Sequence, residues 1–363
     1  MALVSLLESV RPQILQEGLV YLVILYSIFT VGNVPSASAS KCPLRRIPGP
    51  FWARITSIPI SAATIKGQRA QEIYKLHQQY GSVVRIGPNE VSIGDYRYYR
   101  PIYTDSKSIV KDSHFYAAAT FIGKDNIFQM TNPTQHSARR RLSAIPYSLQ
   151  SVTSLNPLDE LVEEAMGIMF AGSGTTSTTL TYLFYAISLP ENSAIQTKLR
   201  EEVLSLPDDD ILALRNNDYI NAVIKETFRL FPTIISTLPR IVTEAFQMEN
   251  FTLPTGTVVG MQNYVHHRDP SVFPEPNTFR PERWLESTKE MELSLTPFSM
   301  GRRNCIGQNL AWDELYLAVD SVMRAPFKLL LGKEVKSGEM DMEDRFNIAP
   351  KGRRLMLEIV PLS

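Results

Sequence analysis

One cysteine in a loop rich in glycine and arginine constrains this chain more than any other stretch. Residues 298–307 read FSMGRRNCIG, and Cys305 is one of two cysteines in 363 residues. Residues 308–319 read as a helix, so Cys305 lies just before a helix N-terminus. The helix dipole, with Arg302 and Arg303, favours a thiolate there. A thiolate without a partner cysteine is a nucleophile or a metal ligand. The alternative is a small buried core residue, and the residues alone leave the two equally open.

The spacing within this loop resembles the haem-ligand loop of the cytochrome P-450 family. The pattern F-x-x-G-x-R-x-C-x-G is filled at each defining position, by Phe298, Gly301, Arg303, Cys305 and Gly307. The resemblance implies that Cys305 is the catalytic thiolate ligand of haem iron. It also implies that Phe298 packs near the sulfur and that Arg303 pairs with a haem propionate. A thiolate ligand pushes electron density toward the iron and favours cleavage of the O–O bond.

Charge and cysteine content exclude some classes of protein. Lys plus Arg and Asp plus Glu both number 37, and no basic run is interleaved with aromatic residues. The sequence therefore gives no indication of nucleic acid binding. Cys42 and Cys305 lie in unrelated segments, so a disulfide framework is not expected. Such a low cysteine content is typical of proteins in a reducing compartment that faces the cytosol.

An uncharged stretch at residues 18–31 reads GLVYLVILYSIFTV. It is short for a hydrocarbon core of about 30 Å, so two interpretations compete. It is either a signal-peptide core, with a small-residue cleavage site at 37–39, or a short membrane anchor.

The charges that flank this stretch favour the anchor. Lys41 and the arginines at 45–46 follow it, whereas only Arg11 precedes it, which places the C-terminal side in the cytosol. The Pro-Gly-Pro at 48–50 is similar to the proline hinge that follows the anchor in eukaryotic members of the family. We therefore expect an N-terminal region at 1–40 with an anchor at about 18–32, a hinge at 41–50 and a haem-thiolate catalytic domain at 51–363.

The elements expected next follow the order of the family fold. The pattern predicts a helix over 68–80 that ends at Gly81, two short strands within 82–93 and a short helix over 95–103. This order resembles the first helix, first hairpin and second helix of the family.

A basic helix is predicted at 134–144, which reads TQHSARRRLSA. The ordinary interpretation of three consecutive arginines is a solvated face. His136 and Arg140, however, are four residues apart and share a face. They match the helix of the family whose residues reach the haem propionates. Arg139 and Arg141 then point elsewhere, toward an acidic electron donor.

The sequence departs from the family pattern after Ser148. Few residues separate Ser148 from Ala171, where family members place several helices, including those that roof the substrate cavity. The predicted fold is therefore mainly α with small β-sheets, a cytochrome P-450 fold shortened by the loss of several helices between Ser148 and Ala171. An internal deletion, a short isoform and a faulty gene prediction would all produce this pattern.

The long helix predicted at 158–188 carries the motif AGSGTT at 171–176. Taken alone, its small residues indicate close packing more often than catalysis. The motif resembles the oxygen-binding helix of the family, which implies that Thr175 lies beside the distal oxygen and helps to deliver protons. Gly174 stands where the family usually has an acid. The usual proton relay is therefore in question, and a chain of water molecules is the substitute.

A second signature supports the resemblance. Glu226 and Arg229 share a face of the helix predicted at 221–230, and alone they would be a surface ion pair of small worth. The segment FRPERW at 279–284 resembles the family motif whose arginine joins such a pair. The resemblance implies a buried, structural triad of Glu226, Arg229 and Arg283.

The remaining positions carry weaker signals. Arg240 matches an arginine of the family that often reaches a propionate. His266 and His267 read as ordinary polar residues, without a metal. A helix is predicted at 310–323, and terminal strands are predicted at 327–331 and 355–360.

The resemblance implies a haem-thiolate monooxygenase. Electrons come from NADPH through a flavoprotein reductase, and one oxygen atom enters an apolar organic substrate. The sequence motifs are similar to those of fungal members that tailor secondary metabolites such as terpenoids or polyketides. The expected location is the endoplasmic reticulum membrane, with the catalytic domain facing the cytosol.

Two alternatives stay open. Gly174 motivates a haem-thiolate isomerase or dehydratase that needs no reductase, and the missing segment motivates a non-catalytic remnant.

Overall fold

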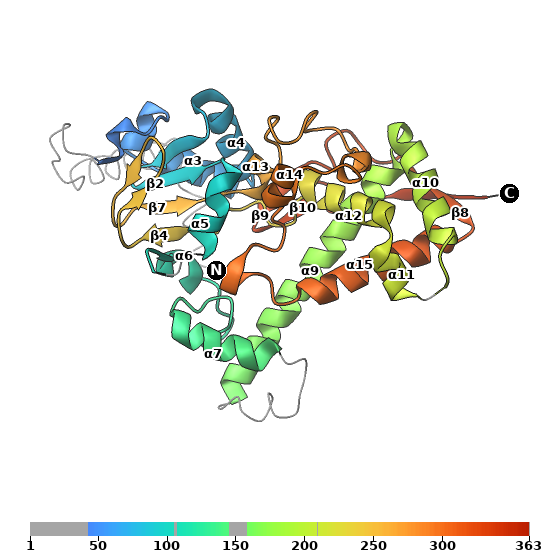
Figure 1. The fold of residues 1–363 in the computed structure, drawn as a ribbon, viewed down its shortest axis with the longest axis horizontal. Coiled ribbons are helices and arrows are strands. Elements are labelled where there is room, and N and C mark those ends of the chain that lie inside the picture. The colour runs from blue at the N-terminus through green and yellow to red at the C-terminus, as the bar shows by residue number, and fades with distance from the viewer. Residues whose placement is uncertain (1–42, 105–106, 145–157, 209, 363) are drawn as a thin grey trace, which may run out of the picture.

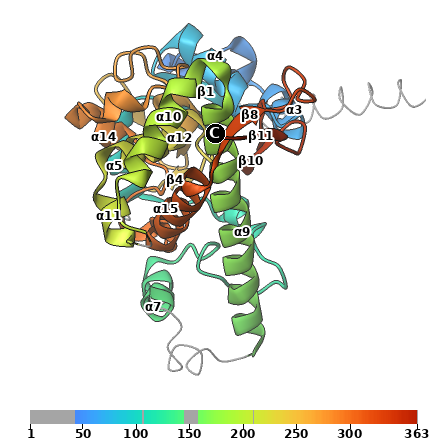
Figure 2. The same cartoon turned by 90° about the vertical axis from the view of Figure 1, so that its right-hand side faces the viewer.

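The computed structural model describes residues 43–104, 107–144, 158–208 and 210–362. A region rich in strands lies at one end of the molecule and a region of helices at the other (Figure 1). The long helix α9, Leu158–Ser188, runs from the helical region, and its first half extends away from the body beside α7, Pro133–Ala144 (Figure 2).

A five-stranded sheet joins two distant parts of the chain. The strand order is β1-β2-β7-β4-β3, in which β2 and β7 are parallel and the other neighbours are antiparallel. The strands are β1 Val83–Gly87, β2 Glu90–Ile93, β3 Ile109–Lys111, β4 Arg240–Val242 and β7 Val258–Gly260. A small hairpin, β5 Phe246–Gln247 and β6 Thr252–Leu253, lies between β4 and β7 in the chain.

The first elements pack around this sheet. They are the 3-10 helices η1 Pro43–Arg46, η2 Phe51–Arg54 and η3 Tyr96–Tyr98, and the α-helices α3 Ile58–Ile65, α4 Arg69–Tyr80, α5 Tyr99–Thr104 and α6 Ser113–Ala117. Helix α4 ends at Gly81, whose φ of 95° is readily adopted only by glycine. The predictions of a helix at 68–80 and of two strands within 82–93 are confirmed, whereas the helix predicted at 95–103 is divided into η3 and α5.

Helices form the larger core. They are η4 Pro190–Asn192, α10 Ser193–Leu204, α11 Ile211–Asn216, α12 Asp218–Leu230, α13 Asn263–His266, η5 Pro281–Trp284, α14 Lys289–Ser294, η6 Gly301–Arg303 and α15 Gln308–Arg324. The second half of α9 packs with α10, α12 and α15 around wholly buried side chains, among them Leu183, Leu199, Val223 and Val319. The N-terminus of α12 is capped by Asn217, whose side chain accepts a hydrogen bond from the Ile220 amide (2.9 Å).

Two antiparallel strand pairs complete the fold. They are β8 Phe327–Leu331 with β11 Leu357–Pro361, and β9 Met342–Arg345 with β10 Asn347–Pro350. The Ile348 amide donates to the Thr233 carbonyl (2.8 Å), so the β9–β10 hairpin is bound to the segment that follows α12. The terminal strands were predicted, and the short strands β3, β4, β7, β9 and β10 were not.

The first half of α9 exposes apolar side chains. Leu158, Met169 and Phe170 are each more than half exposed. Helix α7 ends at Ala144 and α9 begins at Leu158, so little chain separates them. An exposed apolar face of this kind is expected where covering helices are missing, in agreement with the predicted shortening.

The N-terminal predictions fall mostly outside the described residues. The anchor predicted at about 18–32 lies in the part that is not described, and no helix within the described ranges is long and apolar enough to cross a membrane. The described part of the hinge packs against β1, because the Pro48 carbonyl accepts a hydrogen bond from the Arg85 amide (2.8 Å).

Candidate cofactor site around Cys305

The Cys305 loop is closed by its own backbone. The Cys305 amide donates to the Phe298 carbonyl (2.8 Å). Gly301 has a φ of 70°, and a Cβ there would lie 2.9 Å from Cγ2 of Thr104, so both conformation and packing require glycine. A Cβ on Gly307 would meet no protein atom within 4 Å. The loop is therefore packed at Gly301 and open beside Gly307.

The Cys305 thiol is free and partly exposed. Desolvation by the surrounding loop raises its pKa, although the Gly307 amide and the charge of Arg140 act in the opposite direction. The expectation that the helix dipole, Arg302 and Arg303 favour a thiolate is therefore wrong for the protein alone. A metal ion that binds the sulfur would displace the proton.

Phe298 packs on the side of the loop that faces the helical core. Its ring lies 5.2 Å from that of Phe228 in a T-shaped contact and 6.4 Å from that of Trp312, measured between centroids. These aromatic contacts fix the start of the loop against α12 and α15.

Two arginines bind this loop to the chain around α7. Arg140 donates to the carbonyl of Asn304 (2.7 Å) and to its side-chain oxygen (2.6 Å). Arg303 donates to the carbonyls of Met130 (2.7 Å) and Thr131 (3.0 Å). Both guanidinium groups are thus held by neutral oxygens.

A group of buried basic side chains lies next to the loop. Arg240 of β4 donates to the Tyr116 hydroxyl (2.8 Å), and the ammonium of Lys111 in β3 lies 4.1 Å from the centre of the same ring. Burial, followed by the charges of Arg303 and Arg240, lowers the pKa of Lys111 to about 6. Burial and the charge of Arg303 lower the pKa of His136 to about 3. These side chains are close enough to repel one another electrostatically.

A pocket of about 40 Å³ opens among these groups. The chain around it supplies Lys111, His136, Arg240, Arg302 and Arg303, and its described lining contains no carboxylate. Such a pocket is suited to an anion, which would relieve the repulsion between the cations.

The structure thus brings several predicted residues together. His136, Arg240 and Arg303 line one pocket, and Arg140 contacts the loop. Thr175 lies in α9, where its hydroxyl donates to the Ala171 carbonyl (2.8 Å).

Arg139 and Arg141, which both lie in α7, differ in their surroundings. Arg139 forms an ion pair with Glu160 of α9 (2.8 Å), so the expectation that it faces an electron donor is wrong. Arg141 is exposed, as that expectation requires.

Lys111 was not predicted. It is a single lysine in an otherwise ordinary segment, and its neighbours Tyr116, Arg240 and Arg303 approach it only through the sheet and the loop. No local sequence signal could have marked it.

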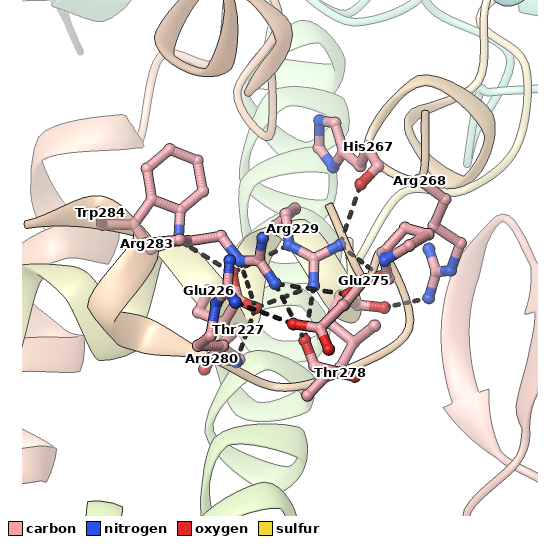
Figure 3. A network of polar contacts seen from close by, with 12 residues as sticks. Glu226, Thr227, Arg229, His267, Arg268, Glu275, Thr278, Arg280, Arg283 and Trp284 are labelled. Carbon is pink, nitrogen blue, oxygen red and sulfur yellow. Dashed lines mark hydrogen bonds and ion pairs between the residues drawn. The ribbon is translucent and has the colours of Figure 1, made fainter. Parts of the chain in front are cut away.

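A buried ion-pair network is centred on Glu226 of α12 (Figure 3). Glu226 pairs with Arg229 through two bonds (2.8 and 2.9 Å) and with Arg283 (3.1 Å). The Glu226 carboxylate also accepts from the indole of Trp284 (2.9 Å) and the amide of Arg280 (2.9 Å). The pair with Arg229 lies within α12, whereas the contacts with Arg280, Arg283 and Trp284 join α12 to the segment around η5.

His266 and His267 are fully buried, so the prediction that they are ordinary polar residues is wrong. His266 Nε2 lies 2.9 Å from the Thr296 hydroxyl, and His267 Nε2 accepts from the Thr296 amide (3.1 Å). Burial lowers the pKa of His266 to about 3, so this ring is neutral at physiological pH.

Comparisons with known proteins identify the family of the chain. The cytochrome P450 family model matches residues 147–356, which is more than half of the chain. The chain belongs to the cytochrome P450 family. Its members carry a haem held by a cysteine thiolate and receive electrons from a reductase.

Individual relatives show how much of the chain is shared. It is 38% identical over 197 residues to the cytochrome P450 monooxygenase TRI4 of Fusarium sporotrichioides, which covers 50% of this chain and 37% of that protein. The chain thus spans well under half of that relative's length. It is 25% identical to the cytochrome P450 monooxygenase hkm5 of Aspergillus hancockii over 497 aligned positions, covering 95% of this chain and 96% of the other. That alignment is longer than the 363-residue chain, so hkm5 has residues that this chain lacks.

The fold is similar to that of the retinoic acid-bound cyanobacterial CYP120A1. The TM-score is 0.69 at 16% sequence identity, with 86% of this chain and 99% of the other covered. The mainly helical fold with small sheets that the sequence predicts is therefore confirmed.

The residues around Cys305 fit a haem. The basic pocket suits the propionates, because its cations have no carboxylate among its described lining. Ile306 and Leu310, which follow Cys305, are exposed apolar side chains, and the space beside Gly307 is open. A flat apolar group with an anionic edge matches these features.

Proposed function

We propose that this chain is a haem-thiolate monooxygenase that acts on an apolar organic substrate. The observation that carries the proposal is the position of Cys305, on an open loop beside a buried basic pocket. The bound haem supplies oxygen activation, and the overall reaction converts RH, O2, NADPH and H⁺ into ROH, H2O and NADP⁺.

In this proposal the chain's residues hold and orient the cofactor. Cys305 is the iron ligand, and Phe298 packs beneath the loop that carries it. In this proposal the haem propionates are bound by His136, Arg140, Arg240 and Arg303. Three of these residues, His136, Arg240 and Arg303, line the basic pocket, which supports this role.

Two further groups support the site. Thr175 holds a proton near the oxygen-binding side of α9, where its hydroxyl is fixed by the Ala171 carbonyl. Glu226, Arg229 and Arg283 keep the core beneath the loop rigid without taking part in the chemistry.

The partners and location are part of the proposal. An NADPH-dependent flavoprotein reductase supplies the electrons, and a short anchor at about 18–32 with the hinge at 41–50 holds the domain 51–363 on the endoplasmic reticulum, facing the cytosol. The fungal relatives TRI4 and hkm5 support a role in secondary metabolism. The proposed substrate is a terpenoid or polyketide.

The carbon monoxide difference spectrum of the dithionite-reduced protein tests the proposal. We expect a Soret band typical of thiolate ligation, which Cys305→Ser abolishes while Ser299→Ala retains it. NADPH oxidation should require the reductase. Turnover of a substrate without reductase or NADPH would instead support an isomerase or dehydratase, and a wild-type chain without the thiolate band would identify a non-catalytic remnant.

A further inference from the structure

Five exposed positions form a straight stripe along the first half of α9. They are Leu158, Val162, Ala165, Met169 and Gly172, and successive members are separated alternately by four and three residues. An average spacing of 3.5 residues keeps such positions on one side of a helix, as in the seam of a coiled coil. These five positions are called the α9 seam below.

The opposite side of this half of α9 is already covered. Glu163 and Glu164 are buried, and Glu163 accepts hydrogen bonds from the amides of Phe121 (2.8 Å) and Ile122 (2.7 Å). Each residue of an α-helix is rotated by about 100° from the one before, which places the seam on the side away from these two carboxylates. The loop before α7 therefore covers one side of α9 and leaves the seam exposed.

The seam is better suited to another helix than to a membrane. Its spacing matches the knobs-into-holes packing of two helices, and the exposed Ile168 flanks it and widens the contact. Asp159 and Glu160 make the first turn acidic, and Asp159 is exposed beside Leu158. An anionic lipid surface would repel this end of the helix.

The seam is complementary to itself when two copies pair in antiparallel orientation. With Ala165 on the two-fold axis, Leu158 lies opposite Gly172 of the second copy, and Val162 lies opposite its Met169. Each larger side chain thus meets a smaller one, so the two helices keep a nearly constant separation. A Cβ on Gly172 would meet no protein atom within 4 Å, which leaves room for the leucine.

The charges of α9 favour the antiparallel orientation. Leu158 and Gly172 lie four turns apart, so the two acidic first turns would be separated by about 20 Å, at opposite ends of the pair. A parallel pair would bring these like charges together, and they would repel one another. The first half of α9 extends away from the body, so the two bodies also lie at opposite ends (Figure 2).

We propose that the α9 seam binds the seam of a second copy of this chain, as a short antiparallel coiled coil with its two-fold axis at Ala165. The pairing covers apolar side chains that the shortened chain leaves exposed. Both copies use the same surface, so the assembly closes as a dimer and does not grow into a filament. The seam is short, and we therefore expect a reversible dimer with a micromolar dissociation constant.

Charge reversal at the two-fold axis tests the pairing. The full chain is purified in a non-ionic detergent, and light scattering after size-exclusion chromatography measures the mass of the protein. The wild-type chain should show about twice the monomer mass. Ala165→Glu and Ala165→Lys should each weaken the dimer about ten-fold or more, because two like charges meet at the axis. An equimolar mixture of the two variants should restore the dimer, since opposite charges then meet.

Ala194→Glu is the matched control, because Ala194 is an exposed alanine of α10 outside the seam. It should retain the mass of the wild-type chain. A monomeric wild-type chain would overturn the inference and indicate that detergent, lipid or residues 18–31 cover the seam. A dimer that survives both charge reversals would overturn it too, and so would one that both variants lose and their mixture does not restore.

Cysteine cross-linking tests the orientation. Mild oxidation of a mixture of Leu158→Cys and Gly172→Cys should link one variant to the other, and neither variant should link to itself. The wild-type chain, oxidised in the same way, reports links through Cys42 and Cys305. Links within each variant alone would overturn the antiparallel arrangement. None of these measurements requires bound haem, so their failure is distinguishable from failure of the proposed function.

Discussion

At the scale of single residues, Glu226 is the carboxylate that accepts the most hydrogen bonds among the described residues. Its two oxygens receive five hydrogen bonds, from Arg229 (two), Arg283, Trp284 and the Arg280 amide. Its side chain and that of Arg229 are fully buried. A buried charge is tolerable only when it is paired in this way, so removing one partner leaves the others unsatisfied.

Glu226→Gln should therefore destabilise the protein by about 3 kcal/mol, because two buried guanidinium groups lose their counter-charge. Urea unfolding would measure the loss. Glu292→Gln, which breaks the exposed Lys225–Glu292 pair, should cost less than about 1 kcal/mol. Similar losses in the two variants would show that the buried network contributes little.

Sequence reasoning identified residues that belong to a motif and missed those that stand alone. His136, Arg240 and Arg303 each lie at a recognisable spacing, and the structure places all three around one pocket. Lys111 has no such context. Its surroundings arise from strand pairing and from contacts between distant segments, which no local pattern encodes.

At the scale of elements, one carboxylate of α9 holds the loop before α7. Glu163 is fully buried and accepts hydrogen bonds from the amides of Phe121 (2.8 Å) and Ile122 (2.7 Å) and from the side chain of Asn126 (2.8 Å). The aromatic rings of Phe121 and Phe170 also meet, at 5.7 Å. The loop therefore depends on α9 for its conformation.

Glu163→Ala should increase hydrogen exchange at the amides of Phe121 and Ile122 about ten-fold or more, because both lose their acceptor. Exchange measured by mass spectrometry would report it. Glu160→Ala, one turn earlier on α9 and paired with Arg139, is the control and should leave these two amides protected. Unchanged exchange in Glu163→Ala would show that other contacts hold the loop.

Long elements were predictable and short ones were not. The helix predicted at 158–188 has the same bounds as α9, because 31 residues of consistent pattern outweigh local exceptions. Strands β3, β4 and β7 have three residues each, too few for a periodicity, and their partners lie far away in the sequence.

At the scale of the whole molecule, the basic pocket makes stability depend on pH. Burial lowers the pKa of Lys111 to about 6 from its ordinary value of 10.5. Between these values the unfolded chain binds a proton that the folded chain does not. The stability of the haem-free protein should therefore rise with pH across this window, by up to about 1.4 kcal/mol per pH unit from this group.

Unfolding of the haem-free protein by urea at pH 7 and pH 9 would measure this slope. Lys111→Met should reduce the slope and stabilise the protein at pH 7. Lys198→Met removes another lysine above a tyrosine ring, that of Tyr219 (4.0 Å), and should leave the slope unchanged. Bound haem should flatten the slope too, because its propionates favour the charged lysine. A slope that Lys111→Met leaves intact would contradict this account.

The pairing of β3 with β4 has a consequence for a shortened chain. These neighbouring strands hold residues 109–111 beside residues 240–242, so the whole shortened interval lies inside the loop that their pairing closes. The entropy lost on closing a loop grows only with the logarithm of its length, by about 0.6 kcal/mol for each doubling. Removing helices from the interval therefore makes the sheet slightly easier to close and leaves its topology intact. The shortened chain therefore exposes apolar side chains on α9, while the β3–β4 pairing that joins its N-terminal and C-terminal parts is kept.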